Sequence, residues 1–218
     1  MTLQEWNERY RTAERAAEDP HAGPTPLLKH WTDQLPPGRA LDLACGAGRN
    51  GLYLAEKGWT VTAVDGASAA IDQLRQRAAE RNLMVETVVA DLTSPEFSIE
   101  PNSWNLIAVC YYLQRDLFPA ILAGVRPGGC AIAVVHISEE GEPPSYKRAE
   151  RGELRGYFKG WKILHDYEGK SHDPEHRRSV AEIVAEMRDL NVGTQQRERI
   201  LGYASTSARI QTQGRRMT

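Results

Sequence analysis

The sequence predicts an α/β fold, a doubly wound Rossmann-like sheet of seven strands that is mostly parallel and ends in an antiparallel hairpin. Three observations support this prediction. Short runs of apolar and β-branched residues alternate with segments of helical periodicity, which is the pattern of βαβ units. Ala131–Val135 is wholly apolar, as expected for a strand with helices on both faces. The last two predicted strands have no helix between them, so we expect them to pair antiparallel.

The region before the first strand predicts a helical cap. Residues 1–19 have the polar composition of an amphipathic or solvated helix, and His21–Pro26 is rich in Gly and Pro, which predicts turns. Leu27–Leu35 is a short helix candidate that ends at Pro36-Pro37-Gly38. The patterns divide the chain into a cap, a sheet domain and a tail, at residues 1–35, 36–190 and 191–218.

The first βαβ unit follows the cap. Ala40–Ala44 is an apolar run, interrupted only by Asp42, that ends at a glycine turn. Asn50–Lys57 has apolar residues at helical spacing and stops at Gly58. Thr60–Val64 is rich in β-branched residues, which favour a strand.

The next units repeat this pattern. Ala69–Arg81 repeats its apolar residues every three or four positions, and Ser68 is a suitable N-cap for that helix. Leu117–Val125 is a further helix, which Arg126-Pro127-Gly128-Gly129 stops. A short helix is expected at Glu153–Phe158. The remaining strands are expected at Met84–Ala90, Trp104–Cys110, Cys130–His136, Trp161–Tyr167 and Ser179–Met187.

Composition excludes several classes of function. The net charge is −2 and the pI is near 6.3, so no global field attracts nucleic acid or an anionic membrane. The start of the chain is polar and no run of about 18 apolar residues occurs, which predicts a cytoplasmic protein without a membrane span. We expect Cys45, Cys110 and Cys130 to be free buried thiols; none lies in a Cys-x-x-Cys motif, so no metal site is predicted.

The strongest motif is the glycine turn within Leu41–Asn50. Gly46 and Gly48 permit a tight turn and let the backbone approach a ligand where a Cβ would clash. Ligands of such sheets bind at the carboxyl ends of the strands. There Asp65 can accept the hydroxyls of a ribose, while Asp91 can accept an adenine amino group and Leu92 present its backbone N–H. Asp65 and Asp91 are also suitable as helix N-caps, and that structural alternative stays open.

The glycines alone do not select the ligand. Gly46-x-Gly48-x-x-Gly51 also matches the pattern of nicotinamide dinucleotide enzymes. However, Asp42 precedes the turn, and an acid there suits a ligand with a cationic ammonium better than a pyrophosphate. A buried carboxylate without a partner is costly, so a purely structural role for Asp42 is hard to explain. Asp91 and the terminal hairpin also favour S-adenosylmethionine over a dinucleotide.

These segments resemble a known family. Leu41–Gly48, Asp65, Asp91 and Arg126-Pro127-Gly128-Gly129 resemble the successive motifs of class I S-adenosylmethionine-dependent methyltransferases. More particular segments resemble the small-molecule branch that includes tellurite-resistance and thiopurine-type methyltransferases, from about Trp6 to Met187. They are Trp6-Asn7-x-Arg9-Tyr10, Gly46-Ala47-Gly48-Arg49-Asn50 with Tyr53-Leu54-Ala55 and Gly58-Trp59, and Glu153-Leu154-x-x-Tyr157-Phe158-x-Gly160-Trp161.

The resemblance implies roles for matching positions. Asp42 would organise the ammonium directly or through water, Tyr10 would fold over the cofactor as a lid, and Tyr111 would follow the fourth strand toward the methyl group. The other implied cofactor residues are Ala44, Gly46, Gly48, Arg49, Asn50, Asp65, Gly66, Asp91, Leu92, Val109 and Cys110. The residues selected for catalysis are His136, Tyr112 and Arg177; Tyr146, His172 and His176 were also candidates near the acceptor.

The predicted function is methyl transfer by in-line displacement to a small molecule: a thiol, a chalcogen oxyanion, an amine or a hydroxyl. A macromolecular acceptor usually requires a basic groove or an added module, and the sequence shows neither. We therefore expect no nucleic-acid partner, and either a monomer or a homodimer. Two alternatives remain: an NAD(P)-dependent oxidoreductase of Rossmann type, and a non-catalytic S-adenosylmethionine-binding protein.

Overall fold

The computed structural model describes residues 2–12, 23–143 and 145–188. It contains one seven-stranded sheet with the order β3-β2-β1-β4-β5-β7-β6. The strands are β1 (Arg39–Leu43), β2 (Thr60–Asp65), β3 (Val85–Val89), β4 (Trp104–Cys110), β5 (Val125–His136), β6 (Lys162–Lys170) and β7 (Ser179–Glu186). The first five are parallel, whereas β7 pairs antiparallel with both β5 and β6. The predicted fold class is confirmed.

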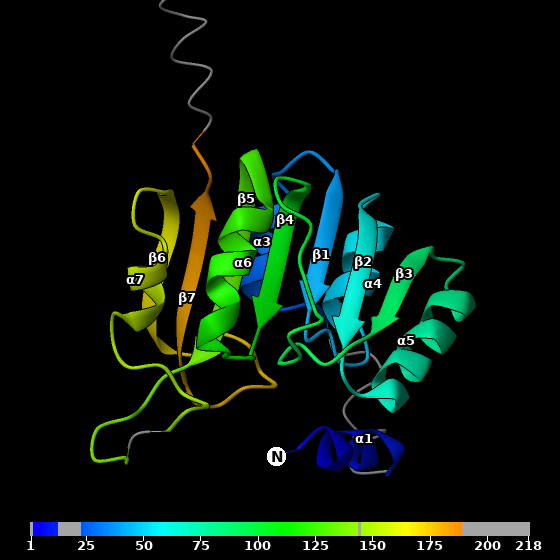
Figure 1. Cartoon of the computed structure of the whole chain (residues 1–218), viewed down its shortest axis with the longest axis horizontal. Helices are drawn as coiled ribbons and strands as arrows, with labels where there is room; N and C mark the ends of the chain where they lie inside the picture. The colour runs from blue at the N-terminus through cyan, green and yellow to red at the C-terminus, as the bar shows by residue number, and fades with distance from the viewer. Residues whose placement is uncertain (1, 13–22, 144, 189–218) are drawn as a thin grey trace, which may run out of the picture. The chain divides into compact units, whose positions relative to one another are not determined.

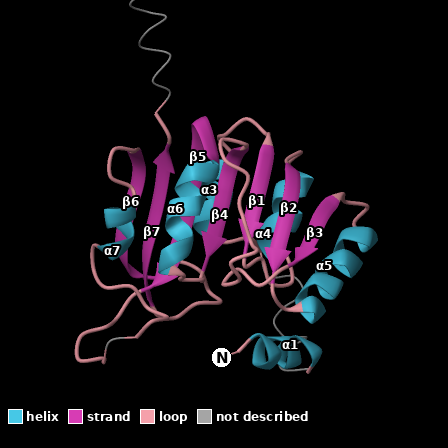
Figure 2. Ribbon diagram, viewed as in Figure 1, coloured by secondary structure: helices cyan, strands magenta, loops and turns pink. Residues whose placement is uncertain are grey.

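The helices lie around this sheet (Figures 1 and 2). They are α1 (Leu3–Arg11), α3 (Pro26–Thr32), α4 (Arg49–Glu56), α5 (Ser68–Glu80), the 3-10 helix η1 (Arg115–Leu117), α6 (Phe118–Gly124) and α7 (Glu153–Tyr157). One apolar cluster joins the sheet to α3, α4 and α5, and a second joins its other face to α6 and α7. Both faces of the central strands are therefore buried, which explains their nearly continuous apolar sequences.

Alternation along β1 decides which residues face each layer. Leu41 and Leu43 belong to the cluster beside α6, whereas Ala40 belongs to the cluster beside α4. Asp42 has the same parity as Ala40, because successive side chains of a strand point to opposite faces. Asp42 therefore points beneath α4 and is 1% exposed.

The Arg126-Pro127-Gly128-Gly129 segment was wrongly predicted to lie before the fifth strand. β5 begins at Val125 and contains it. Its amide and carbonyl groups find ladder partners: Gly128 donates to the Met187 carbonyl and Met187 donates to the Gly129 carbonyl, each at 2.9 Å. Gly128 has φ +75, and the register with β4 shifts between Trp104 and Leu106, so the turn residues form an irregularity within the strand.

The start of α5 also differs from the prediction. Ser68 is the first helical residue, the N-cap position is Ala67, and no side chain of that residue caps the helix. Asn7 of α1 instead accepts a hydrogen bond from the Ala69 amide at 2.8 Å. A sequence window around Ser68 cannot reveal such a cap, because its donor and acceptor lie far apart in the chain.

Two predicted segments lie partly or wholly outside the described residues. The helix expected over residues 1–19 is described only as α1, which ends at Arg11. The tail expected over residues 191–218 falls entirely outside the described residues. No described helix has the length and apolarity that a membrane crossing requires.

Candidate donor and acceptor site

The glycine turn after β1 lies at the carboxyl ends of the parallel strands. Ala44, Gly46 and Gly48 have φ values of +52, +55 and +84, so the turn runs through the left-handed region three times. A Cβ on Gly48 would lie 2.4 Å from Cδ1 of Leu74 in α5. The turn is thus pressed against α5, and glycine is required at residue 48 for both its backbone angle and its packing.

Asp65 holds this turn in place. Its Oδ2 accepts a hydrogen bond from the Gly46 amide and its Oδ1 accepts one from the Ala67 amide, both at 2.8 Å. The carboxylate therefore joins the turn after β1 to the segment that leads into α5. Asp65 is not the N-cap of α5, whose N-cap position is Ala67. The role of Asp65 toward a ribose stays a prediction.

Asp91 and Leu92 follow β3. Oδ1 of Asp91 accepts hydrogen bonds from the amide and the hydroxyl of Thr93, at 2.9 and 2.7 Å, which makes a local turn. Leu92 is buried, and its carbonyl accepts a hydrogen bond from Nε2 of Gln114 at 2.9 Å. The Gln114–Leu92 bond joins the segment after β3 to the segment after β4, across the ends of β2 and β1.

Asp42 lies under the first turn of α4. A Cβ on Gly51 would lie 3.3 Å from its Oδ2, and this oxygen has no hydrogen-bond partner among the described residues. Burial raises the pKa of Asp42 to about 7; the Gly51 amide and Arg49 oppose this shift and Asp65 reinforces it. α4 therefore covers the carboxylate of Asp42.

Arg49 begins α4 and binds a residue that the sequence did not suggest. Its Nη2 donates to Oδ2 of Asp173 at 2.7 Å and to Oγ1 of Thr25 at 3.2 Å. Oδ2 of Asp173 also accepts a hydrogen bond from the hydroxyl of Tyr111 at 2.9 Å. Burial lowers the pKa of Arg49, but the hydrogen bond and charge of Asp173, together with Tyr111 and Cys110, raise it by more, so that its pKa is raised overall.

Three rings meet above the ends of β4 and β5. Tyr111 stacks on His176 with centroids 3.3 Å apart, and His136 lies 5.4 Å from Tyr111 and 5.3 Å from His176. Tyr111 has φ +62, which is unusual for a bulky residue and is typical of functional positions. We call Tyr111, His136 and His176 the ring cluster. Of its members, only His136 was selected for catalysis.

The surroundings of His136 favour the neutral form of its ring. Burial lowers its pKa, and the charge of Arg178 lowers it further. Its Nδ1 is buried and has no hydrogen-bond partner in the described part of the chain. Above its lowered pKa the ring is neutral, so it can accept a proton.

The other selected catalytic residues lie elsewhere. Tyr112 donates to Oε1 of Gln114 at 2.7 Å; burial and the charge of Asp91 raise the pKa of Tyr112 to about 12. Tyr112 therefore lies toward the β3 side, beside the expected adenine position. Arg177 is exposed on the loop between β6 and β7. It is the neighbouring Arg178 that forms an ion pair, with Glu142.

The cysteines are free, as predicted. Cys45 and Cys130 are buried, while Cys110 is only partly exposed after β4. Burial raises the pKa of the Cys110 thiol to about 12 and that of Cys130 to about 11, so neither is a thiolate at neutral pH. Val109 is buried in the core just before Cys110, so its side chain does not face the site. No cluster of three metal-ligating side chains occurs among the described residues.

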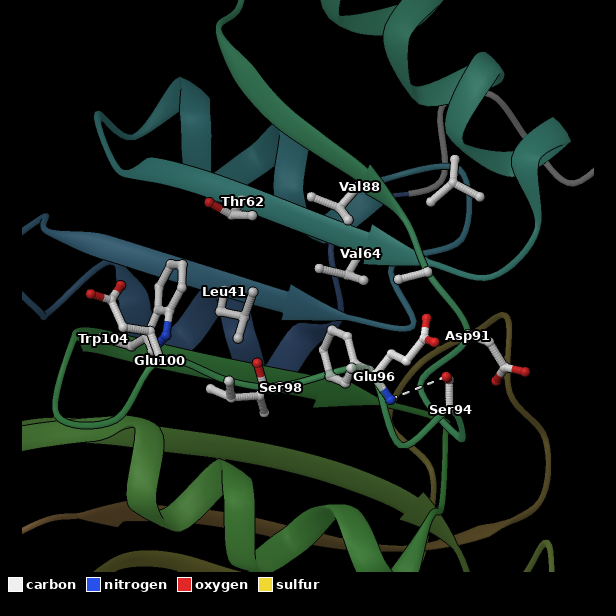
Figure 3. Close-up of a pocket in the computed structure, with 14 residues that line it drawn as sticks. Leu41, Thr62, Val64, Val88, Asp91, Ser94, Glu96, Ser98, Glu100 and Trp104 are labelled. Atoms are coloured by element: carbon white, nitrogen blue, oxygen red, sulfur yellow. Dashed lines mark hydrogen bonds between the residues drawn. The ribbon is translucent and has the colours of Figure 1, made fainter.

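A cavity of about 650 Å³ lies on the sheet face opposite α4 (Figure 3). Leu41, Val64 and Val88 form its floor, and the connection between β3 and β4 forms its outer wall. Among the predicted cofactor residues only Asp91 lines it, at one end. The cavity therefore adjoins the predicted adenine position and does not contain the glycine turn.

α1 lies beyond the carboxyl ends of the strands, next to the start of α5 (Figure 1). The hydroxyl of Tyr10 lies 2.5 Å from the position that a Cβ on Gly46 would take. Cδ2 of Leu3 lies 2.4 Å from the corresponding position at Gly66. Tyr10 thus contacts the glycine turn, and its role as a lid over a cofactor stays a prediction.

Comparison with known proteins relates this geometry to a family. Residues 28–188 match the model of the family "Tellurite resistance protein TehB". The chain is 30% identical over 136 residues to the probable S-adenosyl-L-methionine-dependent methyltransferase TehB of Haemophilus influenzae. That match covers 59% of this chain and 47% of the relative, so the chain spans about half the length of the curated relatives it matches.

Solved structures agree on the fold. The crystal structure of TehB from Haemophilus influenzae has a TM-score of 0.65 at 24% identity, covering 84% of this chain and 67% of that one. The 1,6-didemethyltoxoflavin-N1-methyltransferase of Burkholderia thailandensis, with bound S-adenosylhomocysteine, has a TM-score of 0.64 at 17% identity, covering 86% and 87%. The family model, which matches most of the sheet domain, confirms the predicted resemblance: this chain belongs to the TehB family of class I methyltransferases.

Proposed function

We propose that this chain is an S-adenosylmethionine-dependent methyltransferase that acts on a small-molecule acceptor. The observation that carries the proposal is the adjacency of two features. The left-handed turn at Gly46 and Gly48 is fastened by Asp65, and Arg49 at the end of that turn contacts the ring cluster through Asp173 and Tyr111. The proposed cofactor-binding side (the donor side), at the glycine turn, therefore adjoins the proposed acceptor side, at the ring cluster.

The donor side has features that fit the cofactor. The carboxylates of Asp65 and Asp91 lie at the ends of the adjacent strands β2 and β3, as a ribose and an adenine require, and Tyr10 and Leu3 of α1 cover the backbone at Gly46 and Gly66. The residues proposed to hold it are Tyr10, Ala44, Gly46, Gly48, Asn50, Asp65, Gly66, Asp91 and Leu92. Four further residues are proposed to support this site without side-chain contact to the cofactor, because their side chains are buried or already bonded within the protein. They are Asp42, Arg49, Val109 and Cys110.

On the acceptor side, the ring cluster supplies shape and one base. The cofactor contributes an electrophilic methyl group, and the protein contributes orientation and a site without water. Neutral His136 accepts the proton of an acceptor that must lose one. Tyr111 and His176 present ring faces that position the acceptor. Arg177 is proposed only for attraction of an anionic acceptor, because its side chain is exposed.

The two alternative functions agree with the structure to different degrees. Dinucleotide-binding sheets of Rossmann type end in parallel strands, whereas β7 here is antiparallel, which disfavours an NAD(P)-dependent oxidoreductase. Gly51 has a packing role above Asp42 that accounts for the third glycine of the dinucleotide pattern. A non-catalytic S-adenosylmethionine-binding protein would share the donor side, and only turnover distinguishes it.

Two measurements test the proposal. In calorimetry, S-adenosylhomocysteine should bind at micromolar concentration and NADH should not; the reverse result would refute the proposal. The protein is then incubated with S-adenosylmethionine and a panel of thiols, amines, phenols and chalcogen oxyanions. Methyl transfer to at least one of them is expected, whereas binding without any transfer would favour the non-catalytic alternative.

A further inference from the structure

The N-terminal helix is attached to α5 by two hydrogen-bonding side chains. Oδ1 of Asn7 accepts from the Ala69 amide at 2.8 Å and from the Ser68 hydroxyl at 3.2 Å. Nε2 of Gln73 in α5 donates to the Tyr10 carbonyl at 2.6 Å. The first turn of a helix has unsatisfied amides, and an Asn oxygen is among their best partners. Asn7 therefore caps α5 from another helix.

α5 depends on this external cap. Its own N-cap position is Ala67, whose side chain has no oxygen, and no side chain from that position bonds the first turn. α1 in turn is short and contains no buried residue. The Asn7 bond therefore supplies the cap that α5 lacks and, together with the Gln73–Tyr10 bond, joins α1 to α5.

Docking of α1 positions two side chains over the proposed donor side. Tyr10 lies over Gly46 and Leu3 lies over Gly66, on the backbone where the cofactor is proposed to lie. Of the described helices, α1 is the one drawn beyond the carboxyl ends of β1 and β2 (Figure 1). α1 therefore covers the backbone at Gly46 and Gly66.

We infer that Asn7 is a positioning residue that fastens α1 as the cover of the donor site, so that release of this cap precedes release of the cofactor product. The inference rests on the proposed function, since it concerns the same site. Asn7 acts through α1 and through the Ala69 amide and does not need to touch the ligand. It makes the residence time of the ligand depend on a hydrogen bond outside the site.

The test uses the full chain and S-adenosylhomocysteine as the probe. Asn7→Ala removes the cap, whereas Asn7→Asp keeps an acceptor of equal capping ability whose charge suits a helix N-terminus. Gln4→Ala is the matched control, because Gln4 is exposed on the same helix. Dissociation of the probe is followed by stopped flow, and hydrogen exchange of the first α5 amides is measured without the probe.

We expect Asn7→Ala to speed probe dissociation roughly fivefold, the effect of a typical N-cap. Exchange at Ala69 should rise in parallel, while Asn7→Asp and Gln4→Ala stay within twofold of the wild type. Faster exchange at Ala69 with unchanged dissociation would show a purely structural cap and overturn the inference alone. Equal losses in Asn7→Ala and Asn7→Asp would overturn it as well. Failure of the wild type to bind the probe would instead overturn the proposed function and, with it, this inference.

Discussion

Arg49 and Asp173 form an ion pair of 2.7 Å that joins the first residue of α4 to the loop between β6 and β7. The side chain of Asp173 is 2% exposed and that of Arg49 is 20% exposed. The residues are far apart in the sequence, and one follows the donor turn while the other precedes His176. The pair therefore links the two halves of the proposed site.

Asp173→Asn should destabilise the fold strongly, because it leaves the partly buried guanidinium of Arg49 without its counter-charge. We expect a loss of about 3 kcal/mol in the free energy of unfolding, measured by urea denaturation. Glu142→Gln is the control, since the Glu142–Arg178 pair is more exposed and should cost at most about 1 kcal/mol. Equal losses of unfolding free energy in the two variants would show that burial of the Arg49–Asp173 pair does not increase its contribution to stability.

Asp42 should make stability depend on pH near neutrality. Its folded-state pKa of about 7 lies above its ordinary value of 3.8, so the folded protein binds this proton more tightly than the unfolded chain. The stabilising contribution is complete below about pH 4 and is lost as the pH rises through 7, with an upper limit of about 4 kcal/mol.

Asp42→Asn removes that titration. The difference in unfolding free energy between the variant and the wild type should therefore grow in favour of the variant from pH 5 to pH 8. Thermal or urea unfolding over this range measures it. A constant difference would mean that Asp42 stays ionised throughout, with a partner that the fold does not reveal.

Gly48→Ala should cost more than Gly58→Ala, although both glycines have φ +84. A Cβ on Gly48 meets Leu74 at 2.4 Å, whereas nothing lies within 4 Å of one on Gly58. The backbone strain is common to both, roughly 1 kcal/mol, and overpacking adds about 1–3 kcal/mol at Gly48 alone. Urea unfolding measures stability, and calorimetry should show weaker S-adenosylhomocysteine binding only for Gly48→Ala. Similar losses in both variants would contradict the close packing of the turn on α5.

His136→Gln should reduce turnover of any acceptor that must lose a proton. In the wild type, the rate should fall as the pH decreases through the lowered pKa of His136, below its ordinary value of 6.5, because the protonated ring no longer accepts a proton. This acid limb should vanish in His136→Gln. His172→Gln is the control, because His172 is exposed on the loop between β6 and β7. This variant should keep the acid limb of the pH profile. An unchanged pH profile in His136→Gln would remove His136 from the mechanism.

Much of the fold was predictable because it depends on local patterns. Apolar runs, helical spacing and the missing helix between the last two strands predict a mostly parallel sheet of seven strands with a terminal antiparallel hairpin, whereas the order of the strands came from the structure. The errors arose where distant residues decide the local structure. Val125–Gly129 joins a strand because Met187 supplies its ladder partners, and Ser68 does not cap α5 because Asn7 does.

The candidate site divides in the same way. The sequence by itself determined the glycine turn, the acids at the ends of β2 and β3, and His136 at the end of β5, because strand ends and their residues are local features that a parallel sheet brings to one edge. Only the tertiary structure decided that Asp42 lies beneath α4, that Asp173 binds Arg49 and that His176 stacks on Tyr111. Those relationships depend on which face a side chain takes and how a loop folds back, and both follow from packing between segments that are distant in the chain.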